Sequence, residues 1–114
     1  MEAERYRTYE TFWPFYVSQH LDATNRRLHF TGTTFVLSSV VAALAVHPAW
    51  LLVAPVAGYG FAWAGHYFVE KNRPATFTYP LWSLRADFRM YRLMLAGAMG
   101  PEIARARQPG AARS

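Results

Sequence analysis

A long uncharged segment dominates the pattern of hydrophobic and polar positions along this chain of 114 residues. Residues 30–69 contain no Asp, Glu, Lys or Arg, and all twelve basic and seven acidic residues lie outside them. The dipeptide His47-Pro48 interrupts the segment and leaves two apolar halves, residues 30–46 and 49–65. A helix needs about 20 residues to cross the hydrocarbon core of a bilayer, and flanking residues bring each half to that length. We therefore expect an all-α, integral-membrane helical hairpin with two transmembrane helices, at about residues 28–47 and 49–69.

The basic residues around this segment predict its orientation. Arg26 and Arg27 precede the first half, Lys71 and Arg73 follow the second, and the turn at His47-Pro48 has no basic residue. Because Lys and Arg concentrate on the cytoplasmic side of membrane proteins, we expect both termini in the cytoplasm, at the inner membrane if the source is bacterial. The alternative is a buried helical pair inside a soluble oligomer, which has the same hydrophobic pattern.

The flanking sequences predict interfacial helices that complete a single membrane domain over residues 1–100. Upstream, an aromatic cluster has the composition found at the depth of lipid headgroups; it comprises Phe12, Trp13, Phe15 and Tyr16. Downstream, apolar residues recur every three or four positions between arginines, which predicts an amphipathic helix; they are Leu81, Leu84, Phe88, Tyr91 and Leu95. Residues 101–114 have no apolar period, so we expect a disordered tail.

Composition and charge narrow the class of protein further. Hydrophobic residues make up 53% of the chain and charged residues only 17%, which is below the roughly 25% typical of soluble domains. The net charge of +5 comes from residues that flank the apolar segment instead of forming a basic stripe among exposed aromatics, so we expect no nucleic-acid partner. Cysteine is absent, which excludes a disulfide or a thiolate site.

Two histidines are predicted to lie level with each other in the hairpin. If the chain turns near residue 48, His29 and His66 are almost equally far from the turn, one on each helix. Small residues on both helices, such as Gly32 and Gly58, favour the close packing that would bring them together. An imidazole at the membrane interface needs a partner. The two rings could form an ordinary hydrogen-bonded pair or share a metal ion, whereas His47 is predicted to be a turn residue on the opposite side.

Further polar residues could complete a site at this end of the hairpin. Glu70 lies four residues after His66 and therefore on the same helix face, and His20 could fold back over it. Two or three imidazoles with a carboxylate suit non-haem Fe(II), although zinc takes similar ligands. The basic residues here obey the positive-inside rule, and they could also bind a substrate carboxylate; we single out Arg26, Lys71 and Arg73.

Two segments resemble the signatures of the Mpo-type membrane protein family. The first is FYVSQH at residues 15–20, followed by NRRLHFTGT at residues 25–33. The second, GHYFVEKNRPA at residues 65–75, matches the family pattern GHxxxEKxRPA and is the more specific of the two. The resemblance covers roughly residues 12–95.

The resemblance implies an activity, because the family includes a yeast Fe(II)-dependent dioxygenase of fatty acid α-oxidation. It implies that this chain shortens a 2-hydroxy fatty acid, or a related lipid, by one carbon. His20, His29 and His66 would be the catalytic iron ligands, with Glu70 as a further ligand or a partner that orients an imidazole. The chain is shorter than the fungal members, so a homo-oligomer could be needed to complete the site. The alternative is a non-enzymatic small lipid-binding or structural membrane protein.

Overall fold

The computed structural model describes residues 6–108, and within them all regular secondary structure is helical. The prediction of an all-α protein is therefore confirmed. The chain divides into two compact units, and the single membrane domain expected over residues 1–100 stays a prediction. The hairpin unit is Asp22–Pro74, and the terminal unit combines Met1–Leu21 with Ala75–Ser114.

The first half of the hairpin unit is one long helix, α2 (Ala23–Ala45). Asp22 caps its start, because the Asp22 carboxylate accepts the backbone N–H of Thr24 at 2.8 Å. The 23 residues of α2 extend about 34 Å, which is enough to cross a hydrocarbon core of about 30 Å. It is the one helix of residues 6–108 that is long and apolar enough to span a membrane.

The second half of the hairpin is not one continuous α-helix. A 3₁₀-helix, η2 (Pro48–Leu52), is followed by α3 (Val53–Ala64) and then by a π-helix, η3 (Gly65–Glu70). His47 acts as the predicted turn residue, since its Nδ1 accepts the N–H of Ala49 at 3.0 Å. Pro55 lies in the first turn of α3, where its missing N–H disturbs no helical bond. The predicted span at residues 49–69 is thus divided among three helix types, and a second transmembrane helix is not confirmed.

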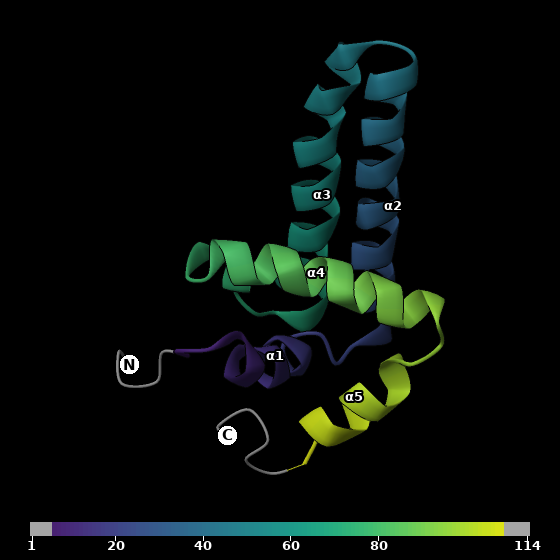
Figure 1. Cartoon of the computed structure of the whole chain (residues 1–114). Helices are drawn as coiled ribbons and strands as arrows, with labels where there is room; N and C mark the ends of the chain where they lie inside the picture. Colours follow the sequence, from purple (N-terminus) through teal and green to yellow (C-terminus); the bar gives the residue numbers. More distant parts are fainter. Residues whose placement is uncertain (1–5, 109–114) are drawn as a thin grey trace. The chain divides into compact units, whose positions relative to one another are not determined.

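Small residues allow α2 and α3 to lie side by side (Figure 1). A Cβ atom added to Gly32 would lie 2.9 Å from Cβ of Phe61, and one added to Gly58 would lie 3.1 Å from Cγ2 of Val36. Both distances are shorter than ordinary van der Waals contact. The sequence-based interpretation of these glycines as helix-packing positions is therefore confirmed.

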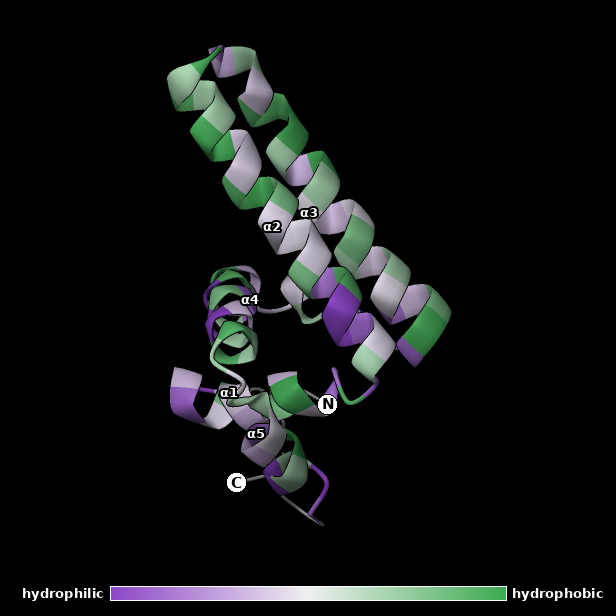
Figure 2. Ribbon diagram, turned by 90° about the vertical axis from the view of Figure 1, so that its right-hand side faces the viewer, coloured by the Kyte–Doolittle hydropathy of each residue, from purple (hydrophilic) through white to green (hydrophobic). Residues whose placement is uncertain are grey.

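The hairpin unit buries small and polar residues and exposes large apolar ones. Leu44 is 85% exposed, Val46 75% and Val56 74%. Hydrophobic residues recur along α3 and along α2 beyond its hydrophilic first turns (Figure 2). The buried positions of these helices and η3 are Asn25, His29, Gly32, Ser39, Gly65 and His66. This distribution is the reverse of that in a water-soluble domain.

The terminal unit has an aromatic core. It contains α1 (Tyr9–Ser18), the 3₁₀-helix η4 (Ala75–Phe77), α4 (Pro80–Leu95) and α5 (Met99–Ala106). The ring of Phe12 is fully buried, with its centroid 5.0 Å from that of Tyr79 and 5.6 Å from that of Trp82. Trp13 and Tyr16 are buried as well. The aromatic cluster that was expected at lipid headgroups therefore packs in a protein core, because later residues supply aromatic partners for it.

The amphipathic helix predicted near residues 81–95 is present as α4, but its apolar stripe does not face the core. Leu81 remains 78% exposed and Leu95 64% exposed, while the buried positions of α4 are Ser83, Ala86 and Met90. The guanidinium of Arg85 lies 3.9 Å above the ring of Tyr9, and that of Arg89 lies 4.1 Å above the ring of Trp13. These cation–π contacts place the arginine side of α4 against α1 and leave the leucines outside.

The disorder predicted for residues 101–114 is wrong for the first part of that range. Residues 101–106 belong to α5, where Ile103 is buried. The indole N–H of Trp13 donates to Glu102 at 2.9 Å, and the guanidinium of Arg107 donates to the carbonyl of Leu21 at 3.3 Å. These long-range contacts stabilise a helix that is too short to show a clear apolar period. Residues 109–114 lie outside the described part of the chain.

Candidate metal centre

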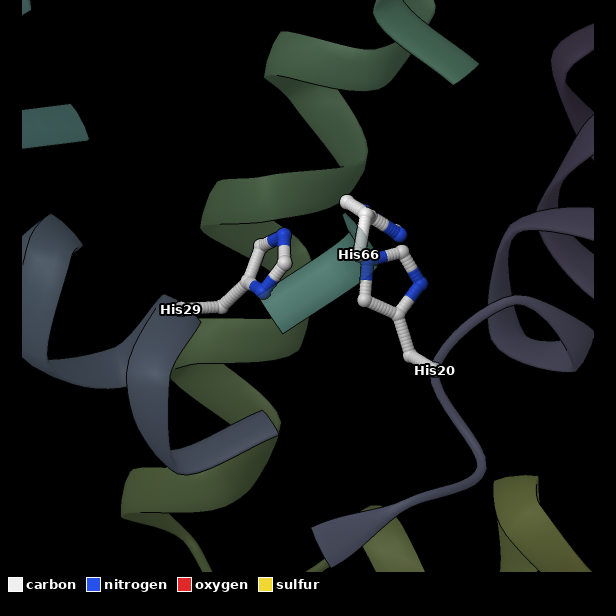
Figure 3. A group of neighbouring side chains, drawn as sticks. All are labelled: His20, His29 and His66. Carbon is white, nitrogen blue, oxygen red and sulfur yellow. The ribbon is translucent and has the colours of Figure 1, made fainter. Parts of the chain in front are cut away.

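Three histidines form a group of buried side chains that could hold a metal ion. They are His20, His29 and His66, and one ring nitrogen from each lies within 4.8 Å of the others (Figure 3). Imidazole nitrogen is a common ligand of zinc and of non-haem iron. These are the three histidines that the sequence singled out.

Within the hairpin unit, His29 on α2 faces His66 on η3. Their ring centroids are 4.9 Å apart, and the ring planes are nearly perpendicular, at 86°. The predicted pairing of these two residues across the hairpin is therefore confirmed. A Cβ atom on Gly65 would lie 1.8 Å from Oδ1 of Asn25, so the chain beside His66 can approach α2 this closely only with glycine.

His20 and His29 make the same kind of contact through Nδ1, with a backbone carbonyl four residues earlier in the chain. Nδ1 of His20 lies 2.6 Å from the carbonyl oxygen of Tyr16, and Nδ1 of His29 lies 3.1 Å from that of Asn25. A carbonyl oxygen only accepts hydrogen bonds, so Nδ1 carries the proton in both rings. In a neutral imidazole the lone pair is then on Nε2, which is the protonation state that a metal ligand requires.

The Nδ1 atom of His66 contacts a side chain instead of a backbone carbonyl. Its Nδ1 lies 2.7 Å from Oδ1 of Asn72, at the end of the turn that follows η3. With the amide oxygen as the acceptor of the Nδ1 proton, the lone pair would be on Nε2. The same tautomer would then be present in all three imidazoles, and a donor set of three nitrogens fits Fe(II) or Zn(II).

Glu70 has a different contact from the one expected of a metal ligand. Its Oε1 accepts the backbone N–H of Asp22 at 2.5 Å, and the residue is not part of the group of three histidines. This bond joins the end of η3 to the start of α2, where the helix dipole favours a negative charge. A ligand role for Glu70 stays a prediction.

The three basic residues predicted to bind a carboxylate lie near the two ends of the hairpin unit. Lys71 and Arg73 follow η3 and are exposed, and Arg26 lies in the first turn of α2 and is partly buried. His47 is exposed at the opposite end, in the turn between α2 and η2. The chain therefore places the basic residues at the end that holds His29 and His66.

In the terminal unit, His20 rests on the buried Tyr16, which pairs with the partly buried Asp87. Its ring stacks on that of Tyr16 with a centroid separation of 4.1 Å, and the phenol of Tyr16 donates to the Asp87 carboxylate. Burial raises the pKa of Asp87 to about 7, against the opposing effect of the Tyr16 hydrogen bond. Burial and the neighbouring Asp87 raise the pKa of Tyr16 well above its ordinary value. The phenol therefore stays protonated and holds the ring that supports His20.

Two contributors to the site were missed in the sequence analysis. Asn72 lies six residues after His66, a spacing that a regular helix does not bring to one face, so no periodicity pointed to it. Asp87 lies far from His20 in sequence and reaches it only through Tyr16. The αL conformation of Lys71, with φ of 61°, creates the turn that brings Asn72 back to His66, and Lys gives no sign of such a conformation.

Comparison with known proteins supplies a family. No curated protein and no solved structure matches the chain. The family model described as 2-hydroxy-palmitic acid dioxygenase Mpo1-like matches residues 6–99, which include the three histidines, Asn72 and the basic residues beside them. Because the match extends over most of its length, the chain belongs to the Mpo1-like family.

Proposed function

We propose that this protein is a membrane-bound, Fe(II)-dependent dioxygenase that shortens a 2-hydroxy fatty acid by one carbon. In the proposed reaction the bond between C1 and C2 breaks and O₂ is the oxidant. C2 becomes the carboxyl carbon of the shortened acid, while C1 leaves as CO₂ and one water is formed. The four electrons that the two carbons lose are the four that O₂ accepts, so the reaction needs no further reductant.

The observation that carries this proposal is the group of three buried histidines in a chain of the Mpo1-like family. His20, His29 and His66 would hold the metal through Nε2, because their Nδ1 protons are donated to acceptors of the chain. Three protein ligands leave coordination positions open for other molecules, as in other non-haem iron sites. When bound, Fe(II) would supply the redox centre at which O₂ and the 2-hydroxy acid react.

The surrounding residues would bind and orient the substrate. Lys71 and Arg73 lie directly after η3, and their positive charges would attract the carboxylate of a fatty acid. Arg26 would contribute from the first turn of α2. The exposed apolar surfaces of α2 and α3 would lie along the acyl chain, so that the reacting end of the lipid is at the basic end of the hairpin.

The apolar surface of the hairpin supports a location in a membrane. We propose that α2 crosses the bilayer and that the η2–α3–η3 half returns across it, with both termini cytoplasmic. The reversed burial of the hairpin unit and the length of α2 favour this topology. The exposed leucines of α4, with Arg85 and Arg92 beside them on the helix, favour a position of α4 at the membrane surface.

Iron content is the first test of the proposal. The full chain is purified anaerobically in detergent, and bound iron is measured by elemental analysis for the wild type and for His66→Ala. We expect iron in the wild type and its loss in the variant. Incubation with a 2-hydroxy fatty acid and O₂ should then give the acid one carbon shorter. Wild type without iron, or iron unchanged in His66→Ala, would instead favour a lipid-binding or structural protein.

A further inference from the structure

The chain beyond His66 folds back onto the histidine that it has just left. The π-helix η3 ends at Glu70, and the φ of 61° and ψ of 42° of its C-cap residue Lys71 lie in the left-handed region. This reversal directs the backbone N–H of Asn72 to the carbonyl of His66, at 2.9 Å. The side chain of the same residue places Oδ1 2.7 Å from Nδ1 of His66. Asn72 therefore holds His66 by its backbone and by its ring.

We propose that Asn72 is a positioning residue that fixes His66 as an Nε2 metal ligand. Its amide oxygen accepts the Nδ1 proton, which keeps the lone pair on Nε2 and limits rotation of the ring. Hydrogen bonds of this kind to metal-binding histidines commonly change metal affinity by 10–100-fold when they are removed. The effect on metal affinity rests on the proposed metal centre, whereas the effect on the tautomer of His66 does not.

The Nδ1 partner of His66 differs in kind from the Nδ1 partners of His20 and His29. His20 and His29 each donate from Nδ1 to the carbonyl oxygen four residues earlier. Substitution of a side chain does not remove a backbone carbonyl, so those two tautomers are set by the fold. His66 is the one member of the group whose Nδ1 partner is a side chain, and a single substitution can remove it.

The chemistry of the amide gives a specific test. An amide has both an acceptor and a donor end, and in the opposite orientation Asn72 would donate to Nδ1 and move the ring proton to Nε2. That tautomer cannot bind a metal through Nε2. A carboxylate in the same place only accepts, so Asn72→Asp preserves the proposed hydrogen bond. Asn72→Leu has a similar size and cannot form it.

The first experiment measures metal affinity of the full chain in detergent, with Co(II) as the spectroscopic probe. We expect Asn72→Leu to weaken Co(II) binding by at least tenfold and Asn72→Asp to bind as tightly as wild type or more tightly. Ser39→Ala is the matched control, because it removes a hydrogen bond to the Phe35 carbonyl within the same hairpin and does not touch a histidine. Wild-type affinity in Asn72→Leu, or equal loss in Asn72→Leu and Asn72→Asp, would overturn the proposal.

The second experiment reads the tautomer directly in metal-free protein. Nitrogen-15 labelling of histidine and long-range proton–nitrogen NMR distinguish Nδ1–H from Nε2–H, and the signal missing from His66→Ala identifies His66. We expect Nδ1–H in wild type and in Asn72→Asp, and a mixture in Asn72→Leu. An Nε2–H form in wild type would refute the inference whether or not the protein binds metal. If Asn72→Leu does not fold, Asn72→Asp decides, because loss of the Nδ1–H form there contradicts the proposed acceptor role.

Discussion

His29 and His66 lie edge to face across the hairpin, with ring centroids 4.9 Å apart. They come from α2 and from η3, so the contact depends on the correct register of the two halves. We expect His29→Ala to lower the affinity of the protein for Fe(II) or Co(II) by at least tenfold, because one of the three proposed nitrogen ligands is lost. His47→Ala is the control, since His47 lies in the turn at the other end. The prediction is checked by metal titration, and it fails if both variants bind metal equally.

The close approach of the chain at Gly65 predicts a large effect of one added methyl group. Gly65→Ala would place Cβ 1.8 Å from the side-chain Oδ1 of Asn25, a buried residue whose backbone carbonyl is the partner of His29. We expect a loss of about 1–3 kcal/mol in the free energy of unfolding, together with weaker metal binding. Gly60→Ala is the matched control, because nothing lies within 4 Å of its added Cβ. Denaturant unfolding in detergent should show the control to be neutral or stabilised by up to about 1 kcal/mol.

Glu70 accepts a hydrogen bond at the start of α2, so we expect it to stabilise the fold and not to bind the metal. The Glu70→Gln variant distinguishes these two roles. The substitution removes the negative charge beside the N-terminus of α2 but keeps an oxygen that can accept the Asp22 N–H. We expect the free energy of unfolding to fall by about 0.3–1 kcal/mol, the usual size of a helix-dipole interaction. Iron content should stay at the wild-type level. A loss of iron without a change in stability would instead identify Glu70 as a metal ligand.

The raised pKa of the partly buried Asp87 carboxyl predicts that stability depends on pH. Its pKa is about 7 in the folded chain against an ordinary value of 3.8. Between these values the folded state holds a proton that the unfolded state has released, so stability falls as pH rises and levels off above about pH 7. The slope contributed by this group is at most about 1.4 kcal/mol per pH unit.

Unfolding measured from pH 4 to pH 8 tests this dependence, with tryptophan fluorescence as the signal. Asp87→Asn cannot ionise, so its unfolding free energy should be flatter over this range than that of wild type. Parallel curves for the two proteins would show that Asp87 does not titrate near neutral pH. The Tyr16→Phe variant should lose the phenol hydrogen bond and raise the pKa of Asp87 further, since that bond lowers it.

The proposed topology predicts which positions contact lipid. The chain has no cysteine, so single substitutions such as Val56→Cys can carry a nitroxide label without background. We expect the label at position 56 to be accessible to O₂ and protected from a water-soluble nickel chelate in lipid vesicles. Leu84→Cys on α4 should be reached by both reagents to an intermediate degree, and the exposed Arg105→Cys on α5 by the nickel chelate. Strong nickel access at position 56 would contradict a second crossing.

Much of this arrangement could be predicted from the sequence because it depends on local or periodic features. The uncharged segment and His47-Pro48 predicted the hairpin, and equal distance from the turn predicted that His29 and His66 would meet. An antiparallel helix pair has few registers, so one turn position determines many contacts. The three histidines were recognised because their residue type is rare in apolar sequence and because they lie in the two family-like segments.

Only the tertiary structure decided which partners these residues have. The aromatic cluster of α1 is a core and not a membrane anchor, because α4 and α5 return to cover it. The second apolar half changes from 3₁₀- to α- to π-helix, and this depends on backbone hydrogen bonds that hydropathy does not encode. The contact between Asn72 and His66 could not be predicted from hydropathy either, because it depends on the left-handed backbone conformation of Lys71. The sequence by itself determined which side chains could bind a metal, and the fold decided which hydrogen-bond partner each Nδ1 meets.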